Sequence, residues 1–242
     1  MQKSAIIIYG PPGSGKGTQA NLIEARLPMA IHFDTGKVLE AMVYDKAKQK
    51  DPVIRRERKN FETGKLMTPA WVFKVVKAKT EETARGGFTI VYSGSPRTLP
   101  EARGLLPVLI RHYGKKNIYP VVLTVSPATS VERNSKRMLC SVCGMTILNT
   151  ILPRGTRLKS CVFCGASFRR RTLDNSEVIK VRLKEYHERT EPIFGYLSGQ
   201  GVGVIKVDGE PAPYKVFSNI LKKIGVRDSL AKSGGGQKDE SR

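Results

Sequence analysis

The sequence lacks a long hydrophobic run, and this absence limits the class of protein. No apolar stretch approaches the roughly 20 residues that a membrane-spanning helix needs. Near the N-terminus, Lys3 precedes only one short apolar run, Ala5–Tyr9, which does not resemble a signal peptide. Internal repeats are also missing. We therefore expect a soluble, cytoplasmic protein whose 242 residues build one core with small inserted lobes.

Acidic residues are scarce relative to basic ones. The chain has 21 Asp and Glu against 42 Lys and Arg, which gives a net charge of +21 and a pI near 10.0. This balance suits polyanionic ligands, and it also predicts nonspecific attraction to RNA or DNA. Most of these charges are expected only to solvate the surface.

A glycine-rich loop, Gly10–Thr18, follows the first apolar run. A strand of β-branched residues, a glycine-rich loop with a lysine and then a helical segment are typical of a phosphate-binding loop. Its backbone N–H groups and the helix N-terminus attract a polyphosphate, and Lys16 reaches the outer phosphates. Thr18 would offer its hydroxyl to a bridging Mg²⁺. The loop therefore predicts binding of a nucleoside polyphosphate. Its spacing departs slightly from the usual Walker form, because Gly17 separates Lys16 from Thr18. An ordinary turn is the alternative.

Short apolar runs alternate with longer periodic ones, which predicts an α/β fold with a parallel sheet flanked by helices. The predicted strands are Ala5–Tyr9, Ala30–Phe33, Phe88–Tyr92, Ile118–Val125 and Val202–Val207. The predicted helices are Lys16–Arg26, Gly36–Lys48, Asp51–Thr63, Pro69–Arg85, Leu99–His112, Ala128–Arg137, Ser176–Leu197 and Pro213–Ile224. Two insertions, Asp34–Met67 and Met138–Arg170, are expected over the carboxyl ends of the strands, where such sheets bind ligands. The tail Asp228–Arg242 is expected to be disordered.

The four cysteines form two Cys-x2-Cys pairs. Cys140 and Cys143 are separated from Cys161 and Cys164 by seventeen residues, and a glycine follows each pair. This spacing predicts a structural zinc site, because four thiolates complete a tetrahedral shell and leave no open position. Two disulfides are the alternative, which an intracellular location disfavours. We expect the metal to stabilise a small lobe that cannot fold on its own apolar core.

At this point the chain resembles the adenylate kinase family, in its long form with a zinc-binding lid. The resemblance spans residues 4–225 and rests on five segments in the family's order: Gly10–Thr18, His32–Gly36, Gly64–Thr68, Gly94–Pro100 and Arg182–His187. It implies a P-loop kinase fold with a five-stranded parallel sheet, formed by residues 1–33, 68–135 and 175–227. It also implies a nucleoside monophosphate (NMP)-binding lobe at 34–67 and a lid at 136–174. The implied reaction is reversible phosphoryl transfer from Mg²⁺-bound ATP to AMP by a monomer, giving two ADP.

The resemblance further implies the residues around the reaction. The catalytic set would be Lys16, Arg97, Arg137, Arg171 and Arg182, which stabilise the charge of a transferring phosphoryl group. ATP would be bound by Gly13, Ser14, Gly15, Lys16, Gly17, Thr18, Arg133, Arg137 and Pro211. AMP would be bound by Thr35, Lys37, Glu40, Lys65, Leu66, Met67, Gly94, Ser95, Pro96, Arg97, Glu101, Arg171 and Arg182. For any single arginine, an ordinary surface role is the alternative in so basic a chain.

The chain departs from the family pattern at two positions near the metal and the lid. Ser93 stands where the family has an Asp that orients the metal's water shell, and a serine can hydrogen-bond a water without bringing charge. Leu173 replaces one of two lid acids, which leaves Asp174 as the expected partner of the lid arginines.

Two further departures concern the acceptor. Glu40 replaces an Arg that grips the acceptor phosphate, and Lys37, three residues earlier, is expected to neutralise Glu40 and supply the lost cation. Glu101 replaces a Gln that reads the acceptor adenine, and a carboxylate suits the donor edge of guanine at least as well. Three hypotheses follow: an active adenylate kinase, which the retained donor and lid residues favour; a kinase with a relaxed or different base preference, GMP first; and a catalytically weak relative that binds RNA.

Overall fold

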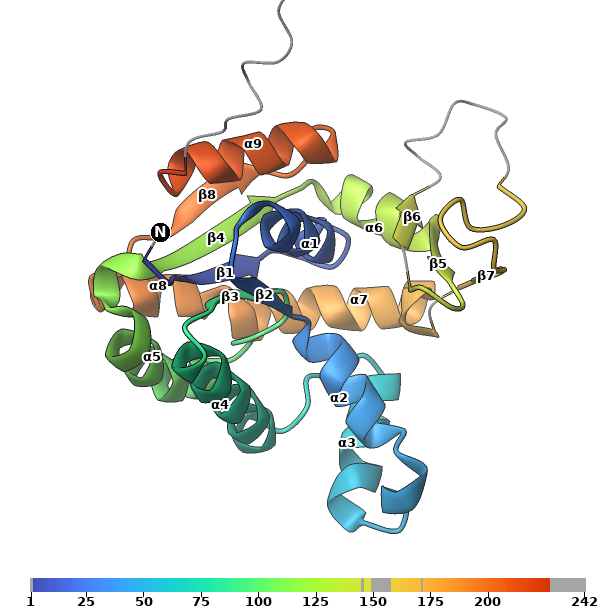
Figure 1. Cartoon of the computed structure of the whole chain (residues 1–242). Helices are drawn as coiled ribbons and strands as arrows, with labels where there is room; N and C mark the ends of the chain where they lie inside the picture. Colours follow the sequence, from blue (N-terminus) through green and yellow to red (C-terminus); the bar gives the residue numbers. More distant parts are fainter. Residues whose placement is uncertain (1, 145, 149–157, 171, 227–242) are drawn as a thin grey trace, which may run out of the picture.

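A computed structural model describes residues 2–144, 146–148, 158–170 and 172–226. Its centre is a sheet of five parallel strands in the order β2-β3-β1-β4-β8 (Figure 1). The strands are β1 (Ala5–Tyr9), β2 (Ala30–Phe33), β3 (Thr89–Tyr92), β4 (Ile118–Thr124) and β8 (Ile205–Asp208). The predicted five-stranded parallel sheet is confirmed, although β8 begins three residues after the predicted Val202.

Helices cover both faces of the sheet, which explains why β1 is apolar at every position. On one face, Ile6 and Ile8 pack with α1 (Lys16–Arg26) and α9 (Pro213–Lys223). On the other face, Ala5, Ile7 and Tyr9 join a cluster with residues of α4 (Pro69–Arg85), α5 (Leu99–Tyr113) and α8 (Pro192–Gly199). A short 3-10 turn, η2 (Lys115–Asn117), leads from α5 into β4. The loop after β1 is thereby fixed at its base from both sides.

The segment between β2 and α4 projects from the sheet as α2 (Thr35–Val43), a 3-10 turn η1 (Lys46–Lys48) and α3 (Pro52–Glu62) (Figure 1). The predicted single helix Gly36–Lys48 is wrong. The chain leaves α2 after Val43 because the Asp45 carboxylate accepts the N–H of Ala47 and starts a new turn. The Glu57 carboxylate, whose side chain is 0% exposed, accepts both the N–H (2.8 Å) and the hydroxyl (2.6 Å) of Thr68 and so ties α3 to the start of α4.

The predicted continuous helix Ser176–Leu197 is divided into three parts. They are α7 (Ser176–Glu185), a π-helical turn η5 (Tyr186–Thr190) and α8. Pro192 has no N–H to donate, and the N–H of Glu191 bonds to the carbonyl of Tyr186 five residues earlier. The turn places the Thr190 hydroxyl 2.9 Å from the carbonyl of Arg97, to which it donates. The π turn thus fixes a loop that sequence periodicity alone does not connect to this helix.

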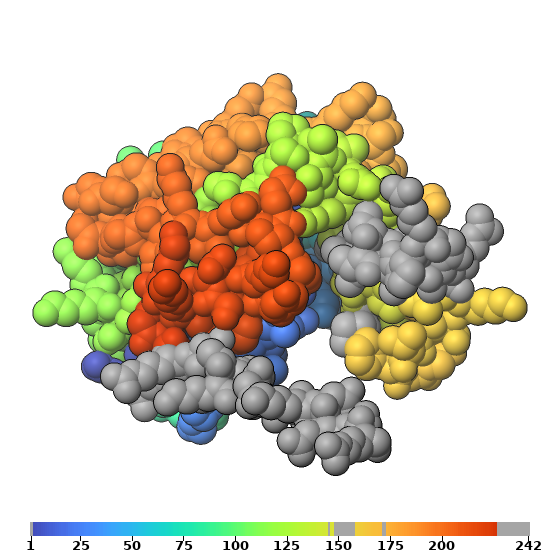
Figure 2. All heavy atoms as spheres, turned by 90° about the horizontal axis from the view of Figure 1, so that it is seen from above, coloured from blue at the N-terminus to red at the C-terminus, as the bar shows by residue number. Residues whose placement is uncertain are grey.

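A small antiparallel sheet, ordered β6-β5-β7, follows α6 (Pro127–Ser135). It comprises β5 (Arg137–Cys140), β6 (Thr146–Leu148) and β7 (Phe168–Arg169), and a 3-10 turn η4 (Thr172–Asp174) leads from it to α7. Arg137 therefore begins a strand, and the predicted helix end at this residue is wrong. Seen from above, the yellow segment that includes β7 lies at one end of the molecule, apart from the red α9 (Figure 2). No helix of the described part is long and apolar enough to cross a membrane.

Candidate active site

The glycine loop lies between the end of β1 and the start of α1. Gly13 has φ +81°, and a Cβ there would lie 2.6 Å from Asn134 Nδ2 and 2.7 Å from the carbonyl of Ser130. The Ser130 hydroxyl donates to the carbonyl of Pro12 at 2.6 Å, so α6 holds the loop in shape. By contrast, a Cβ at Gly15 or Gly17 would meet nothing within 4 Å. The loop is therefore rigid on its protein side and open where the helix N-terminus begins.

Lys16 closes the loop in this structure. Its ammonium donates to the carbonyls of Gly10 (2.8 Å) and Pro11 (2.7 Å). The hydroxyl of Ser14 is buried without a hydrogen-bond partner among the described residues. A Cβ at Gly10 would lie 2.5 Å from Ser14 Oγ, so this hydroxyl packs against Gly10 inside the protein. The open positions at Gly15 and Gly17 are the part of the loop that fits a bound polyphosphate.

A cleft opens beside the loop. Its walls come from four stretches of chain: Ile8, Tyr9, Gly10, Pro12 and Lys16; Gly64 and Leu66; Gly94, Ser95, Pro96 and Arg97; and Arg182, Glu185, Tyr186 and Thr190. Three basic side chains, Lys16, Arg97 and Arg182, line it together with the carboxylate of Glu185. The cleft therefore suits a ligand with several negative charges.

Six of the predicted acceptor residues line the cleft, Leu66, Gly94, Ser95, Pro96, Arg97 and Arg182, whereas Thr35 and Met67 do not. The hydroxyls of Thr35 and Ser95 are buried and have no hydrogen-bond partner among the described residues. The N–H of Leu66 donates to Glu185 Oε2 at 3.3 Å, and Met67 is buried beside it. Lys65, Lys37 and Glu40 lie outside the residues that line the cleft, and the N–H of Lys37 donates to Asp34 as the cap of α2.

Glu101 is buried in the first turn of α5, and it too lies outside the lining of the cleft. One carboxylate oxygen accepts the N–H of Arg97 at 3.0 Å, and the other accepts the Thr98 hydroxyl at 2.9 Å. Burial raises the pKa of Glu101, although these hydrogen bonds and the charges of Arg97 and Arg189 oppose the shift. In this structure Glu101 shapes the loop that carries Arg97.

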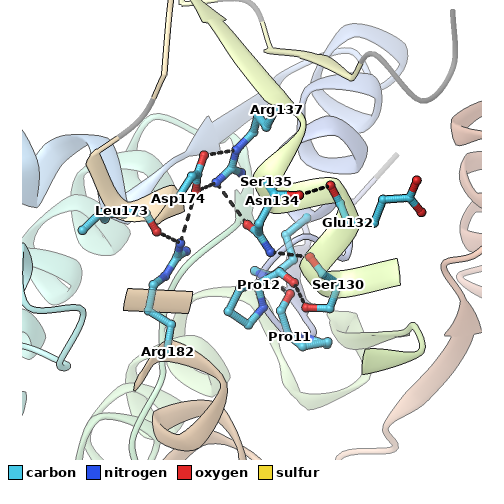
Figure 3. A network of polar contacts seen from close by, with 11 residues as sticks. Pro11, Pro12, Ser130, Glu132, Asn134, Ser135, Arg137, Leu173, Asp174 and Arg182 are labelled. Carbon is cyan, nitrogen blue, oxygen red and sulfur yellow. Dashed lines mark hydrogen bonds and ion pairs between the residues drawn. The ribbon is translucent and has the colours of Figure 1, made fainter. Parts of the chain in front are cut away.

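Asp174 gathers two of the predicted catalytic arginines (Figure 3). Arg137 Nε donates to Asp174 Oδ2 at 2.8 Å, a second bond joins Arg137 Nη2 to Oδ1, and Nη2 also donates to Asn134 Oδ1 at 3.2 Å. Arg182 Nη1 lies 3.6 Å from Asp174 Oδ1 and donates to the carbonyl of Leu173. The carboxylate is 5% exposed and the two guanidinium groups 16% and 14%. The expected pairing of Asp174 with Arg137 is present.

Arg133 reaches the other side of the glycine loop. Its guanidinium donates to the carbonyls of Gly209 (2.8 Å) and Glu210 (2.9 Å), which precede Pro211. Arg133 is therefore joined to the segment that leads into Pro211, the other residue outside the glycine loop and lid that is predicted to bind ATP. Arg171 lies outside the described residues.

The four cysteines come together at the small sheet. Their Sγ atoms all lie within 4.8 Å of one another, and the thiols are free. The Cys140 and Cys164 sulfurs are 3.3 Å apart, well beyond a disulfide bond of about 2.05 Å. Burial raises the pKa of the Cys140 thiol, but the N–H groups of Val142 and Cys143 and the neighbouring thiols outweigh it and lower that pKa to about 6. Four clustered sulfurs with a stabilised thiolate fit a tetrahedral zinc ion.

Comparisons with known proteins agree with this geometry. The family model described as "Adenylate kinase" matches residues 8–202. The chain belongs to the adenylate kinase family. It is 32% identical to the adenylate kinase of Syntrophomonas wolfei (90% of this chain, 98% of that protein) and 32% to that of Kluyveromyces lactis (91% and 93%). It is 30% identical to the adenylate kinase of Methanococcoides burtonii (90% and 97%).

Membership of the adenylate kinase family makes this chain a phosphotransferase, with transfer between ATP and AMP as its reaction. The family uses Mg²⁺-bound ATP, and the open cradle at Gly15 and Gly17 fits such a ligand. Thr18, in the first turn of α1, is the residue that would hold the metal.

Sequence reasoning missed several residues that build this site. Ser130 and Asn134 shape the glycine loop, Glu185 binds the Leu66 segment, and Thr190 holds the carbonyl of Arg97. All four act across long sequence separations, which local motifs do not reveal. Only Glu185 offered a signal, because it lies in the segment Arg182–His187 that carries the family resemblance.

Proposed function

We propose that the cleft between the glycine loop and the acceptor loop is where this adenylate kinase transfers the terminal phosphoryl group of ATP to AMP. The observation that carries this assignment is the shared lining of the cleft by Lys16 after the glycine loop, Arg97 of the acceptor loop and Arg182 of α7. Donor and acceptor phosphates held in the cleft would meet between three positive charges. The reaction is reversible and gives two ADP.

The proposed chemistry is positioning and charge stabilisation. A transferring phosphoryl group spreads negative charge over its equatorial oxygens, and fixed cations stabilise that charge most in a site without water. Lys16 would leave the carbonyls of Gly10 and Pro11 for the ATP phosphates, and Arg97 would bind the acceptor phosphate. Thr18 would hold the Mg²⁺ that neutralises charge on the ATP phosphates. Arg137, Arg171 and Arg182 would complete the charge around the transferring group.

We propose that the segment 136–174 is a lid and 34–67 the NMP-binding lobe, with 1–33, 68–135 and 175–227 as the core. Asp174 supports this division, since it pairs with Arg137 at the start of the lid and with Arg182 on α7. Phosphate oxygens would compete with Asp174 for both guanidinium groups and would draw the lid down. Closure would expel water that could otherwise hydrolyse ATP. The Cys140, Cys143, Cys161 and Cys164 cluster would hold structural zinc that stabilises the lid.

The acceptor is proposed to be AMP, with a blunted preference over GMP. Both oxygens of Glu101 already accept hydrogen bonds from its own loop, and a carboxylate offers no donor to the ring nitrogen of adenine. A kinase with a relaxed base preference is therefore the second candidate. The protein is proposed to act as a cytoplasmic monomer whose basic surface attracts nucleic acid only nonspecifically.

Substitution of Arg97 tests the assignment of the cleft. Arg97→Met should lower kcat/KM for AMP by about 100- to 1000-fold, the effect of losing one fixed charge at a transition state. The matched control is Arg103→Met, because Arg103 is exposed on α5 and lies 6.0 Å from the ring of Tyr196. Arg103→Met should leave kcat/KM within about twofold, as surface changes usually do. Equal effects of the two substitutions would show that Arg97 does not bind the acceptor.

A further inference from the structure

Ser93, which stands at the metal-water position of the family pattern, belongs to a hydrogen-bonded chain of three residues. Its Oγ lies 2.6 Å from Nε2 of His32, and Nδ1 of the same imidazole lies 2.6 Å from Oδ1 of Asn21. Ser93 directly follows β3 and is 7% exposed. His32 is on β2 and Asn21 on α1, so three separate elements meet in this chain.

These three residues lie outside the lining of the cleft but adjoin residues of the proposed site. Asn21 lies three residues after Thr18 on α1, and residues at this spacing share one side of a helix. Ser93 is followed by Gly94 and Ser95, which line the cleft together with Lys16. The His32 backbone is also fixed, because its N–H donates to Glu24 Oε1 at 2.8 Å. The imidazole is therefore held in place between Thr18's helix and the acceptor loop.

The partners of the imidazole decide the direction of the hydrogen bonds. The Asn21 oxygen can only accept, so Nδ1 carries the hydrogen and Nε2 presents a lone pair, an assignment that follows from the hydrogen-bond network. The Ser93 hydroxyl then donates its one hydrogen to Nε2 and turns its lone pairs outward. Burial lowers the pKa of His32, and Lys37 adds to this shift, while Asp34 and Glu24 oppose it. A neutral ring keeps this direction.

We infer that His32, oriented by Asn21, is a positioning residue that turns the Ser93 hydroxyl into an acceptor for the water shell of the ATP-bound metal. An aspartate at this position is an acceptor by its chemistry, whereas a serine can donate or accept. His32 removes that choice because its Nε2 accepts the one hydrogen bond that the Ser93 hydroxyl can donate. The protein thus keeps a hydrogen-bond acceptor at this position without the carboxylate of an aspartate. The inference rests on the proposed function of the cleft.

The tautomer of His32 is the first measurement, and it needs neither metal nor nucleotide. The chain has three histidines, so ¹⁵N NMR of histidine-labelled protein gives few signals, and His32→Gln assigns the one of interest. We expect a neutral ring protonated on Nδ1 at pH 7.5. Its signals should move more when Mg²⁺ and ADP are added together than with ADP in EDTA. A ring protonated on Nε2, or an imidazolium, would overturn the inference, because Ser93 would then have to donate outward.

The second measurement is the Mg²⁺ concentration that gives half-maximal transfer rate. Ser93→Ala should raise it about 10-fold, the lower end of the range for residues that orient metal ligands. His32→Phe should raise it several-fold. The double variant should match Ser93→Ala alone, because His32 acts only through Ser93. Effects that multiply in the double variant would contradict the inference.

Two conservative variants and one control separate this role from general stability. His32→Gln retains an acceptor for the Ser93 hydroxyl and should recover most of the metal dependence lost in His32→Phe. Ser93→Asp should lower the Mg²⁺ requirement below that of the wild type. His112→Gln, in the last turn of α5, should change nothing. A wild-type protein that formed no ADP would refute the proposed function, and the NMR measurement would still decide the direction of the His32–Ser93 bond.

Discussion

Replacing Asp174 by alanine tests the ion pairs that join Arg137, at the start of the proposed lid, to Arg182 on α7. Arg137 and Arg182 would lose their shared carboxylate while staying 16% and 14% exposed. Leaving charges partly buried without a partner costs about 2–4 kcal/mol in the free energy of unfolding. For a protein of this size, that loss lowers Tm by about 4–16 °C. Activity should fall as well, because both arginines would lose their orientation before substrate binds.

Scanning calorimetry and a coupled rate assay measure the two effects in the same preparation. Asp174→Asn keeps the shape of the side chain and should show most of the loss, because charge is the main contribution. The matched control is Glu177→Ala, since Glu177 is 78% exposed and, among the residues that the structure describes, forms an ion pair with Lys180 alone. That variant should stay within about 0.5 kcal/mol of the wild type. A Tm for Asp174→Ala within 2 °C or so of the control would refute the argument.

Four further substitutions probe other parts of the account. Lys16→Met should reduce the transfer rate by a few hundred-fold, about 3–4 kcal/mol, with unchanged circular dichroism, and more than roughly a tenth of the wild-type rate would remove the donor-site assignment. The wild type should contain one zinc per chain by atomic emission, Cys143→Ala should abolish it and expose the lid to protease, and a wild type without metal would end the zinc proposal. Glu101→Gln should sharpen the AMP-to-GMP ratio of kcat/KM by about 1–3 kcal/mol, and an unchanged ratio would mean that the base is read elsewhere. Glu57→Leu should destabilise the protein by about 2–3 kcal/mol in urea unfolding, because Thr68 loses its acceptor.

The Glu57 effect should also depend on pH in one direction. Burial opposes ionisation of Glu57, but hydrogen bonds from Thr68, Arg56 and Asn60 outweigh it and lower the pKa of the carboxyl. A lowered pKa in the folded state gives stability that is complete above the unfolded value of about 4.3 and is lost as the pH falls through the folded value. The deficit of Glu57→Leu should therefore shrink below about pH 4. A deficit that stayed constant down to pH 3 or so would show that Glu57 acts by packing alone.

The fold was predictable where short-range signals and burial agree. β1, β2, α1 and α4 have the predicted bounds: β1 is buried at every position, β2 ends on the buried Phe33, and a proline begins α4. The Ser176–Leu197 prediction failed since the apolar periodicity continues through the π turn, and only Pro192 marks the interruption. The three short strands near the cysteines, β5, β6 and β7, are too short to show an alternating apolar pattern. They could not be predicted from periodicity, because the clustering of the four thiols appears only in the folded structure.

The site was predictable where residues are close in sequence. The glycine loop and the Gly94–Arg97 loop were found because each keeps its chemistry within a few positions. Asp174 was expected to pair with lid arginines only because the family pattern brought it to notice. The contacts of His32 with Ser93 and Asn21 were not predicted, since they join three elements that only the folded sheet brings together.

The central claim is that this chain transfers phosphoryl groups between adenine nucleotides despite Ser93 at the metal position and Glu40 and Glu101 on the acceptor side. Its most direct test is the initial rate of ADP formation by the purified protein from Mg²⁺-ATP with AMP, GMP, CMP or UMP in turn. The account predicts two ADP formed for each ATP consumed with AMP, a smaller but measurable rate with GMP and little with either pyrimidine nucleotide. No ADP formation with AMP, or a higher rate with GMP than with AMP, would contradict it.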